Sequence, residues 1–130
     1  MTTTIRRLAG PIAILGLALL LAGCAGTAQA DQGQPSLDPN AVHIVAKDIA
    51  FTTPQVSAPA GKPFQIQFDN QDSAPHNVAI YTDSSASHAV FQGDIFSSGV
   101  RVYQVPALKP GTYFFRCDVH QNMTGTIVVK

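Results

Sequence analysis

Three side chains able to bind a metal recur at every third position near the end of the chain. Cys117, His120 and Met123 form the pattern Cys-x-x-His-x-x-Met. The aromatic residues 113–115 precede this pattern, and the strand-like residues 126–129 follow it. Both runs have the composition of β-strands. The three side chains are therefore expected on a tight loop between two strands, where they can converge on one point.

A fourth candidate, His76, lies far upstream of Cys117 in the sequence. Two imidazoles, one thiolate and one thioether are the ligand set of a copper site with a trigonal core and a long axial contact. Zinc also takes thiolate and imidazole, but a thioether is a poor zinc ligand. The residues therefore predict a site for one copper ion, made by His76, Cys117, His120 and Met123.

The remaining histidines and the other cysteine have local explanations that need no metal. His43 lies in an apolar, strand-like run, and His88 lies in a polar run rich in serine. The chain has two cysteines, but no disulfide is expected between them. Cys24 ends an apparent targeting signal, and Cys117 ends the aromatic run before the ligand loop.

Composition and pattern both predict an all-β domain over residues 42–130. All eight acidic residues are Asp and none is Glu, which argues against long helices because Asp prefers turns and caps. Residues 64–68 alternate strictly between apolar and polar, as a half-buried strand does. Six or more short strands at this spacing favour a Greek-key sandwich or barrel. The stretch 82–98 is ambiguous, with a short helical turn expected near residues 85–91.

The first 23 residues have the features of an export signal. Arg6 and Arg7 give a positive start, and an almost wholly apolar run follows. The end, Leu21-Ala22-Gly23-Cys24, resembles the lipobox of bacterial lipoproteins, which implies cleavage before Cys24 and a diacylglyceryl group on its sulfur. An uncleaved transmembrane anchor is the alternative, because the apolar run is near the lower limit of about 17–25 residues for spanning a bilayer. Twin-arginine export fits the residues after the arginine pair poorly.

Residues 24–41 are expected to form the lipidated cysteine and a flexible linker. They are small and polar, with one large apolar residue, Leu37. Such a linker spans about 20–25 Å on average, which keeps the domain near a membrane while letting it turn. Both readings of the signal place the domain outside the cytoplasm, anchored to a membrane. The charge is balanced, with no basic run, so the chain has no footprint for nucleic acid.

The loop and the upstream histidine together carry a family resemblance. The segment 111–126, with Pro75-His76-Asn77-Val78 upstream, resembles the cupredoxins, and the likeness covers about residues 42–130. The spacing is that of the short, amicyanin-type ligand loop, although Val119 and Gln121 stand where such loops carry Pro. The resemblance implies a cupredoxin-type β-sandwich that binds one Cu(I)/Cu(II) ion.

The resemblance also implies a role for each site residue. His76, Cys117 and His120 are the strong ligands, and Met123 is axial. Asn77 braces the site by bonding across to the Cys117 loop. The His120 imidazole is partly exposed, and electrons pass through it.

The function expected is that of a tethered one-electron carrier and not of an enzyme. Four protein ligands leave no open coordination position, and metal catalysis usually needs one. The carrier is expected to be a monomer that meets other redox proteins weakly and briefly, through a small apolar patch around His120. The alternative is a copper-binding protein for delivery or tolerance, which would favour open sites rich in Met and His. Multicopper oxidases need additional His-x-His pairs, and a binuclear copper domain needs a second Cys near Cys117; neither occurs. A sandwich without metal is the least favoured alternative.

Overall fold

The computed structural model describes residues 37–130, and these form strands and loops without any helix. The predicted signal sequence, Cys24 and most of the predicted linker lie outside the described residues. No helix in the described part is long and apolar enough to cross a membrane. The strands are β1 (Val42–Lys47), β2 (Ala50–Phe51), β3 (Gln55–Ala58), β4 (Phe64–His76), β5 (Ala79–Tyr81), β6 (Ala89–Gln92), β7 (Phe96–Val105), β8 (Gly111–Arg116) and β9 (Thr124–Val129).

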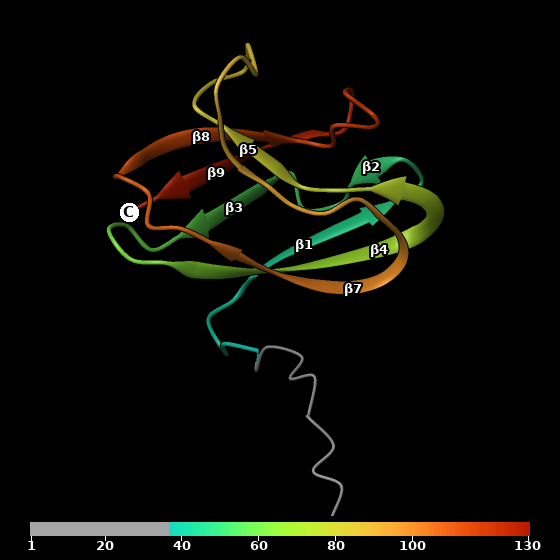
Figure 1. The fold of residues 1–130 in the computed structure, drawn as a ribbon, viewed down its shortest axis with the longest axis horizontal. Helices are drawn as coiled ribbons and strands as arrows, with labels where there is room; N and C mark the ends of the chain where they lie inside the picture. The colour runs from blue at the N-terminus through green and yellow to red at the C-terminus, as the bar shows by residue number, and fades with distance from the viewer. Residues whose placement is uncertain (1–36) are drawn as a thin grey trace, which may run out of the picture. The chain divides into compact units, whose positions relative to one another are not determined.

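The strands form two sheets packed as a β-sandwich (Figure 1). One sheet has the order β2-β1-β4-β7, and the other has the order β3-β9-β8-β5-β6. β1 runs parallel to β4, and β3 runs parallel to β9. The other strand pairs are antiparallel. The predicted all-β sandwich is therefore confirmed.

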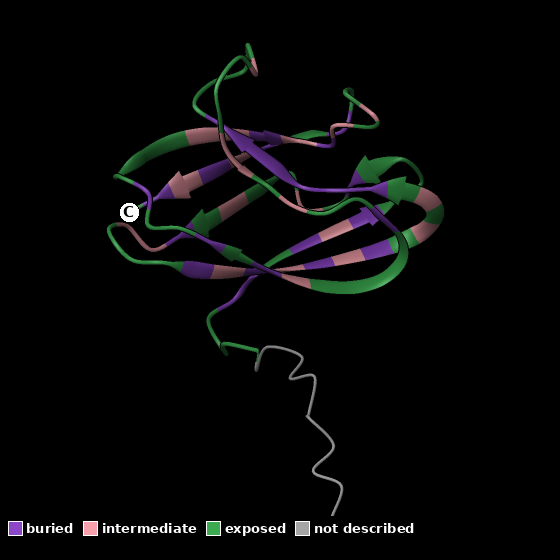
Figure 2. Cartoon of the chain, viewed as in Figure 1, coloured by how far each residue is buried: buried purple, intermediate pink, exposed green. Residues whose placement is uncertain are grey.

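Alternation along the strands fills the space between the sheets. In β4, Phe64, Ile66 and Phe68 are buried, whereas the glutamines between them are partly exposed. Figure 2 shows the same alternation as bands along β1 and β4. The Phe68 ring contacts Phe51 and Phe96 edge-on, with ring centroids 6.2 and 5.6 Å away. Burying one such side chain contributes about 1.5–3 kcal/mol, so we expect this apolar layer to sustain the fold without a metal.

The ambiguous stretch after β5 contains a turn and a strand, so the expected helical turn is wrong. The Asp83 carboxylate accepts the Ser85 backbone N–H at 2.8 Å, and the Thr82 N–H donates to the His88 carbonyl at 3.1 Å. The bond between the Asp83 side chain and a nearby backbone N–H competes with helix formation. The chain then returns as β6, which pairs with β5.

The end of the predicted linker packs on the domain. The Asp38 backbone N–H donates to Gln65 Oε1 at 2.7 Å, and Ala41 is buried. This contact lies at the start of β4, whereas His76 is the last residue of that strand. The chain therefore enters the domain at the opposite end of β4 from the candidate metal ligand.

Candidate metal centre

Two segments from different sheets bring the candidate ligands together. His76 ends β4, and Cys117 directly follows β8. Figure 1 shows the end of β4 and the loop between β8 and β9 at the same end of the sandwich. Within the loop, the Cys117 N–H donates to the Met123 carbonyl at 3.0 Å, and the Met123 N–H donates to the His120 carbonyl at 2.9 Å. These bonds close the loop and turn its side chains toward His76.

The donor atoms lie at the separations that one ion requires. His76 Nδ1 is 3.7 Å from Cys117 Sγ and 3.1 Å from His120 Nδ1, and the three ligand atoms all lie within 4.8 Å of one another. Metal bonds of about 2.0–2.1 Å to nitrogen and about 2.3 Å to sulfur, at angles of about 100–120°, put the ligand atoms of one ion about 3.1–3.8 Å apart. The donor set therefore fits a single ion with a trigonal core, as the sequence predicted.

Three of the four candidate ligands are buried. His76 and Cys117 have no exposed surface, and Met123 is 2% exposed. His120 is the partly exposed member of the set. The His120 N–H also donates to Cys117 Sγ at 3.4 Å, so the sulfur accepts a backbone hydrogen bond from its own loop. The arrangement gives a closed centre with one imidazole near the surface.

Asn77 lies where a brace between the two segments is needed. Its Oδ1 accepts the Asp118 backbone N–H at 2.8 Å, and its Nδ2 donates to the Gly93 carbonyl at 3.0 Å. Asn77 is 2% exposed, so an unpaired amide there would be costly. The geometry agrees with the bracing role that the resemblance implied for Asn77.

Asp118 anchors the ligand loop to three other strands, a role that the sequence did not reveal. Its carboxylate accepts hydrogen bonds from Tyr81 Oη at 2.5 Å, Asn77 Nδ2 at 3.0 Å and Gln92 Nε2 at 3.2 Å. Arg116 Nε lies 3.7 Å from the same carboxylate. Burial raises the pKa of Asp118, but these hydrogen bonds outweigh burial and lower the pKa overall. The charge beside Cys117 is therefore held by neighbours on β5, β6 and β8.

Asp72 is the second residue that sequence reasoning missed. Its Oδ2 lies 2.9 Å from His76 Nε2. An ionised carboxylate only accepts, so Nε2 carries the proton and Nδ1 keeps its lone pair for a metal. The Ile49 amide is the main cause that holds the pKa of Asp72 below its usual value. A carboxylate four residues before a candidate histidine was the available signal, but the register shift in β4 between Asn70 and Pro75, where Asp72 lies, is not visible in the sequence.

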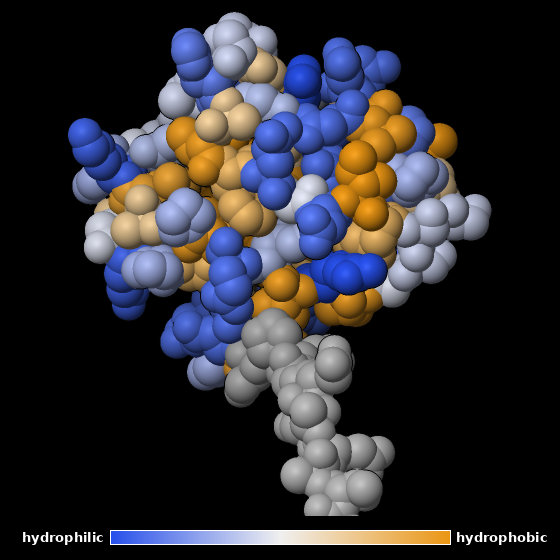
Figure 3. Space-filling view, viewed as in Figure 1, coloured by the Kyte–Doolittle hydropathy of each residue, from blue (hydrophilic) through white to orange (hydrophobic). Residues whose placement is uncertain are grey.

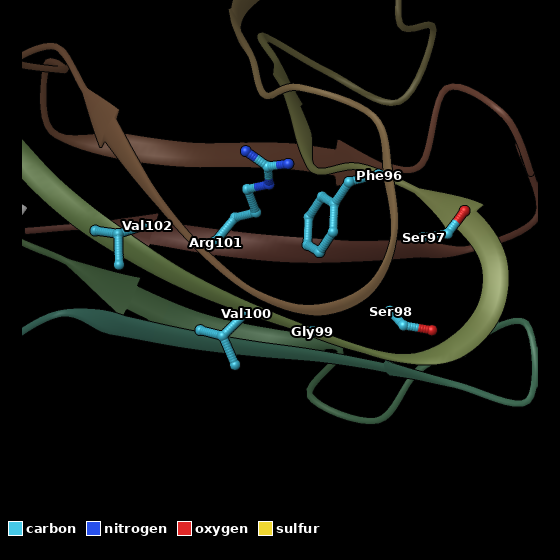
Figure 4. A pocket seen from close by; sticks show the side chains of 7 residues that line it. All are labelled: Phe96, Ser97, Ser98, Gly99, Val100, Arg101 and Val102. Atoms are coloured by element: carbon cyan, nitrogen blue, oxygen red, sulfur yellow. The ribbon is translucent and has the colours of Figure 1, made fainter. Parts of the chain in front are cut away.

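The other histidines and a surface hollow along β7 take no part in this centre. His43 and His88 are exposed and lie outside the cluster of possible ligands among the described residues. A hollow of about 450 Å³ follows β7 from Phe96 to Val102 (Figure 4). Its lining has one charged side chain, Arg101, whose guanidinium lies 5.0 Å from the centre of the Phe96 ring. None of the seven lining residues is a His, Cys, Met or carboxylate, so the hollow has no donors for a metal.

A β-sandwich with a His-Cys-His centre at one end defines the cupredoxin class. The chain belongs to the cupredoxin family, because the model of the cupredoxin-like domain matches residues 11–129. Amicyanin-alpha of Methylorubrum extorquens is 29% identical over 125 residues, which cover 96% of this chain and 99% of that protein.

Solved structures share the fold at lower identity. Auracyanin from the photosynthetic bacterium Roseiflexus castenholzii superimposes with a TM-score of 0.60 at 19% identity, over 68% of this chain and 94% of that one. Amicyanin from Paracoccus versutus gives a TM-score of 0.56 at 23% identity, over 73% of this chain and 86% of that one. These likenesses confirm the cupredoxin fold.

One copper ion is the cofactor of this family, and the residues present fit it. The chain brings together thiolate and imidazole donors at the required separations, with a thioether on the same closed loop. Soft sulfur with imidazole suits copper. The chain is thus a copper protein of the electron-carrier family.

Proposed function

We propose that this cupredoxin is a one-electron carrier that works outside the cytoplasm, tethered to a membrane through Cys24. The observation that carries the proposal is the closed donor set: three ligand atoms within 4.8 Å of one another, with buried Met123 bonded through its backbone to the same loop. We assign His76, Cys117 and His120 as the strong ligands and Met123 as the axial ligand.

The closed centre favours electron exchange over catalysis. Four protein ligands leave no position for a substrate, and metal catalysis needs one. Bound copper supplies one-electron exchange between Cu(I) and Cu(II). The protein residues keep one geometry in both states: Asp72 fixes the His76 ring, and Asn77 ties the Cys117 loop to Gly93, directly after β6. A ligand set held in this way needs little rearrangement when the charge changes.

Electrons would enter and leave through His120, the partly exposed ligand. Val119, beside it in the loop, is 42% exposed, and Ile95, next to the partner of His76 in β7, is 55% exposed. We call Val119 and Ile95 the apolar rim. Figure 3 shows apolar surface on the side where β4 ends in Figure 1. A small apolar area suits weak and brief encounters with other redox proteins.

The experiment that tests the carrier role uses the purified protein loaded with copper. An intense thiolate-to-copper band in the visible spectrum is expected. Self-exchange should be fast enough to broaden the NMR lines of a mixed Cu(I) and Cu(II) sample. A protein that lacks the band and gives up Cu(I) readily to a chelator would favour the alternative role in copper delivery or tolerance.

The tether is tested separately in cells that make the full chain. The protein should be recovered with membranes and should incorporate labelled fatty acid at Cys24. Cys24→Ala should abolish the labelling, whereas Cys117→Ser, which touches only the metal centre, should leave the labelling unchanged. Labelling that persists in the Cys24→Ala variant would contradict the lipid anchor.

A further inference from the structure

The hairpin turn between β1 and β2 has an unusual backbone conformation. Asp48 and Ile49 form the turn, since Lys47 pairs with Ala50, and their φ angles are +54° and +57°. Two positive φ angles in a two-residue hairpin are typical of a type I′ turn, which prefers Asn, Asp or Gly. A β-branched residue such as Ile49 is an outlier there. Strain of this kind persists only where neighbouring contacts enforce it.

Both amides of this turn point at one carboxylate. The Asp48 N–H donates to Asp72 Oδ1 at 2.8 Å, and the Ile49 N–H donates to Asp72 Oδ2 at 3.0 Å. Successive backbone amides of this kind form a concave site for an anion. The strained turn is thus closed over the Asp72 side chain.

The same carboxylate holds the buried ligand His76. Asp72 Oδ2 accepts from His76 Nε2 at 2.9 Å, so three donors share two oxygens. The Asp72 backbone is fixed too, because its N–H donates to Asn70 Oδ1 at 3.0 Å and its carbonyl accepts from Ser98 Oγ at 2.8 Å. The register shift in β4 between Asn70 and Pro75 lets this segment fold back toward the histidine.

We propose that the β1–β2 turn is a positioning element for His76: its two amides fix the Asp72 carboxylate, and the carboxylate fixes the imidazole that holds copper. Asp72 is 13% exposed, so without the amides its side chain could turn to water. The strain at Ile49 is then the cost of aiming two amides at one group. The proposal rests on the assignment of His76 as a ligand in the proposed function.

The first test replaces the carboxylate with its neutral analogue. Asp72→Asn leaves one acceptor oxygen for three donors and turns an NH₂ group toward the others. In the Cu(I)-loaded protein, the His76 Nε2–H signal in ¹H–¹⁵N NMR should exchange with water at least about tenfold faster than in the wild type. Competition with a Cu(I) chelator should show an affinity lower by about 10–100-fold.

The decisive test changes the turn and leaves Asp72 in place. Ile49→Pro removes one amide and fixes φ near −65°, so it opens the turn. Ile49→Gly is the matched control, because it keeps the amide and adopts positive φ without strain. The Pro variant should approach Asp72→Asn in His76 exchange and in copper affinity, whereas the Gly variant should match the wild type. Amide signals of β1 opposite β4 report whether the Pro variant keeps the sheet.

A double variant separates positioning from a general loss of structure. If the turn acts through Asp72, Ile49→Pro should add nothing to His76 exchange in the Asp72→Asn background. An equal increase in both backgrounds would overturn the proposal, as would a Pro variant whose His76 signal matches the wild type. Failure of the carrier role would appear as slow self-exchange in the wild type, and that result would not change any of these measurements.

Discussion

At the scale of single residues, the four candidate ligands differ in their burial and in their hydrogen bonds. His76 and Cys117 are buried: His76 donates to Asp72, and Cys117 accepts from the His120 N–H, whereas the His120 side chain is partly exposed. Met123 is buried, and its backbone closes the loop whatever its side chain does. The thioether can therefore be replaced without opening the loop.

Met123→Leu should keep copper and the visible band, and it should raise the reduction potential. A weak axial ligand tunes the potential, and losing its donor sulfur disfavours Cu(II) relative to Cu(I). A rise of about 60 mV corresponds to a tenfold change in the equilibrium. Voltammetry of both proteins measures the shift. A Leu variant that fails to bind copper would contradict the assignment of Met123 as axial.

At the scale of elements, two tight backbone contacts shape the metal end. Gly125 in β9 pairs with Phe115 in β8, directly after the ligand loop. A Cβ at Gly125 would collide with the Phe115 ring and would lie 2.7 Å from the Pro54 carbonyl oxygen. The glycine is thus required for the sheet to close over the phenyl ring.

Gly125→Ala should lower the free energy of unfolding by about 1–3 kcal/mol, because overpacking displaces the buried Phe115 ring. Thr124→Ala is the control, since Thr124 is the exposed neighbour on the same strand and its replacement should cost at most about 0.5 kcal/mol. Chemical denaturation measures both. Equal stability of the two variants would mean that the sheet adjusts to the added methyl group.

The β1–β2 turn is the second tight element, and it carries a stability prediction of its own. Ile49→Gly should raise the free energy of unfolding by about 1 kcal/mol, because Gly removes a left-handed strain of roughly 1–2 kcal/mol. Ile95→Gly is the control: Ile49 and Ile95 are both 55% exposed, but only Ile49 has positive φ. The control should lose stability, since Gly loses more chain entropy on folding. Thermal unfolding of both variants and the wild type measures these changes in stability.

At the scale of the whole molecule, the apolar core and the metal centre are separate sources of stability. The core cluster runs through both sheets and contains enough buried apolar side chains that we expect it to form without an ion. The metal centre occupies one end, where loops from both sheets meet. Copper is therefore expected to stabilise a fold that already exists, and the rim around the centre is free to meet partners.

Copper loading should raise Tm without changing the far-ultraviolet circular dichroism. Binding only the folded state adds about 2.7 kcal/mol at a free ligand concentration 100 times Kd. For a domain of this size, that is about 10–20 °C. Cys117→Ser should lose the visible band and most of this copper-dependent shift. An unfolded copper-free protein would show instead that the metal builds the fold.

A positive charge on the apolar rim should slow electron self-exchange, because two copies must desolvate it when their His120 faces meet. Val119→Lys is expected to lower the rate by about tenfold or more, equivalent to about 1.4 kcal/mol. Leu37→Lys is the matched control: Leu37 is 43% exposed against 42% for Val119, and it precedes Asp38, which bonds at the far end of β4. Equal slowing by both would indicate a charge effect without a docking face.

The sequence by itself predicted most of the strands and the candidate donor residues. Alternation in β4 and the three-residue spacing of the ligand loop are local patterns that can be read from the sequence. The residue types of the donors, sulfur with imidazole, are enough to predict copper. The separation of linker and domain and the lipid anchor remain predictions from the sequence.

Only the tertiary structure decided what surrounds those donors. Asp72 reaches His76 from a strand bulge, the β1–β2 turn closes on Asp72 from a different hairpin, and Asp118 collects partners from three strands. The strand β6, where a helical turn was expected, depends on pairing with β5. Each of these features joins residues that no local sequence pattern links. Their interactions can therefore form, and stabilise the protein, only after the two sheets have packed.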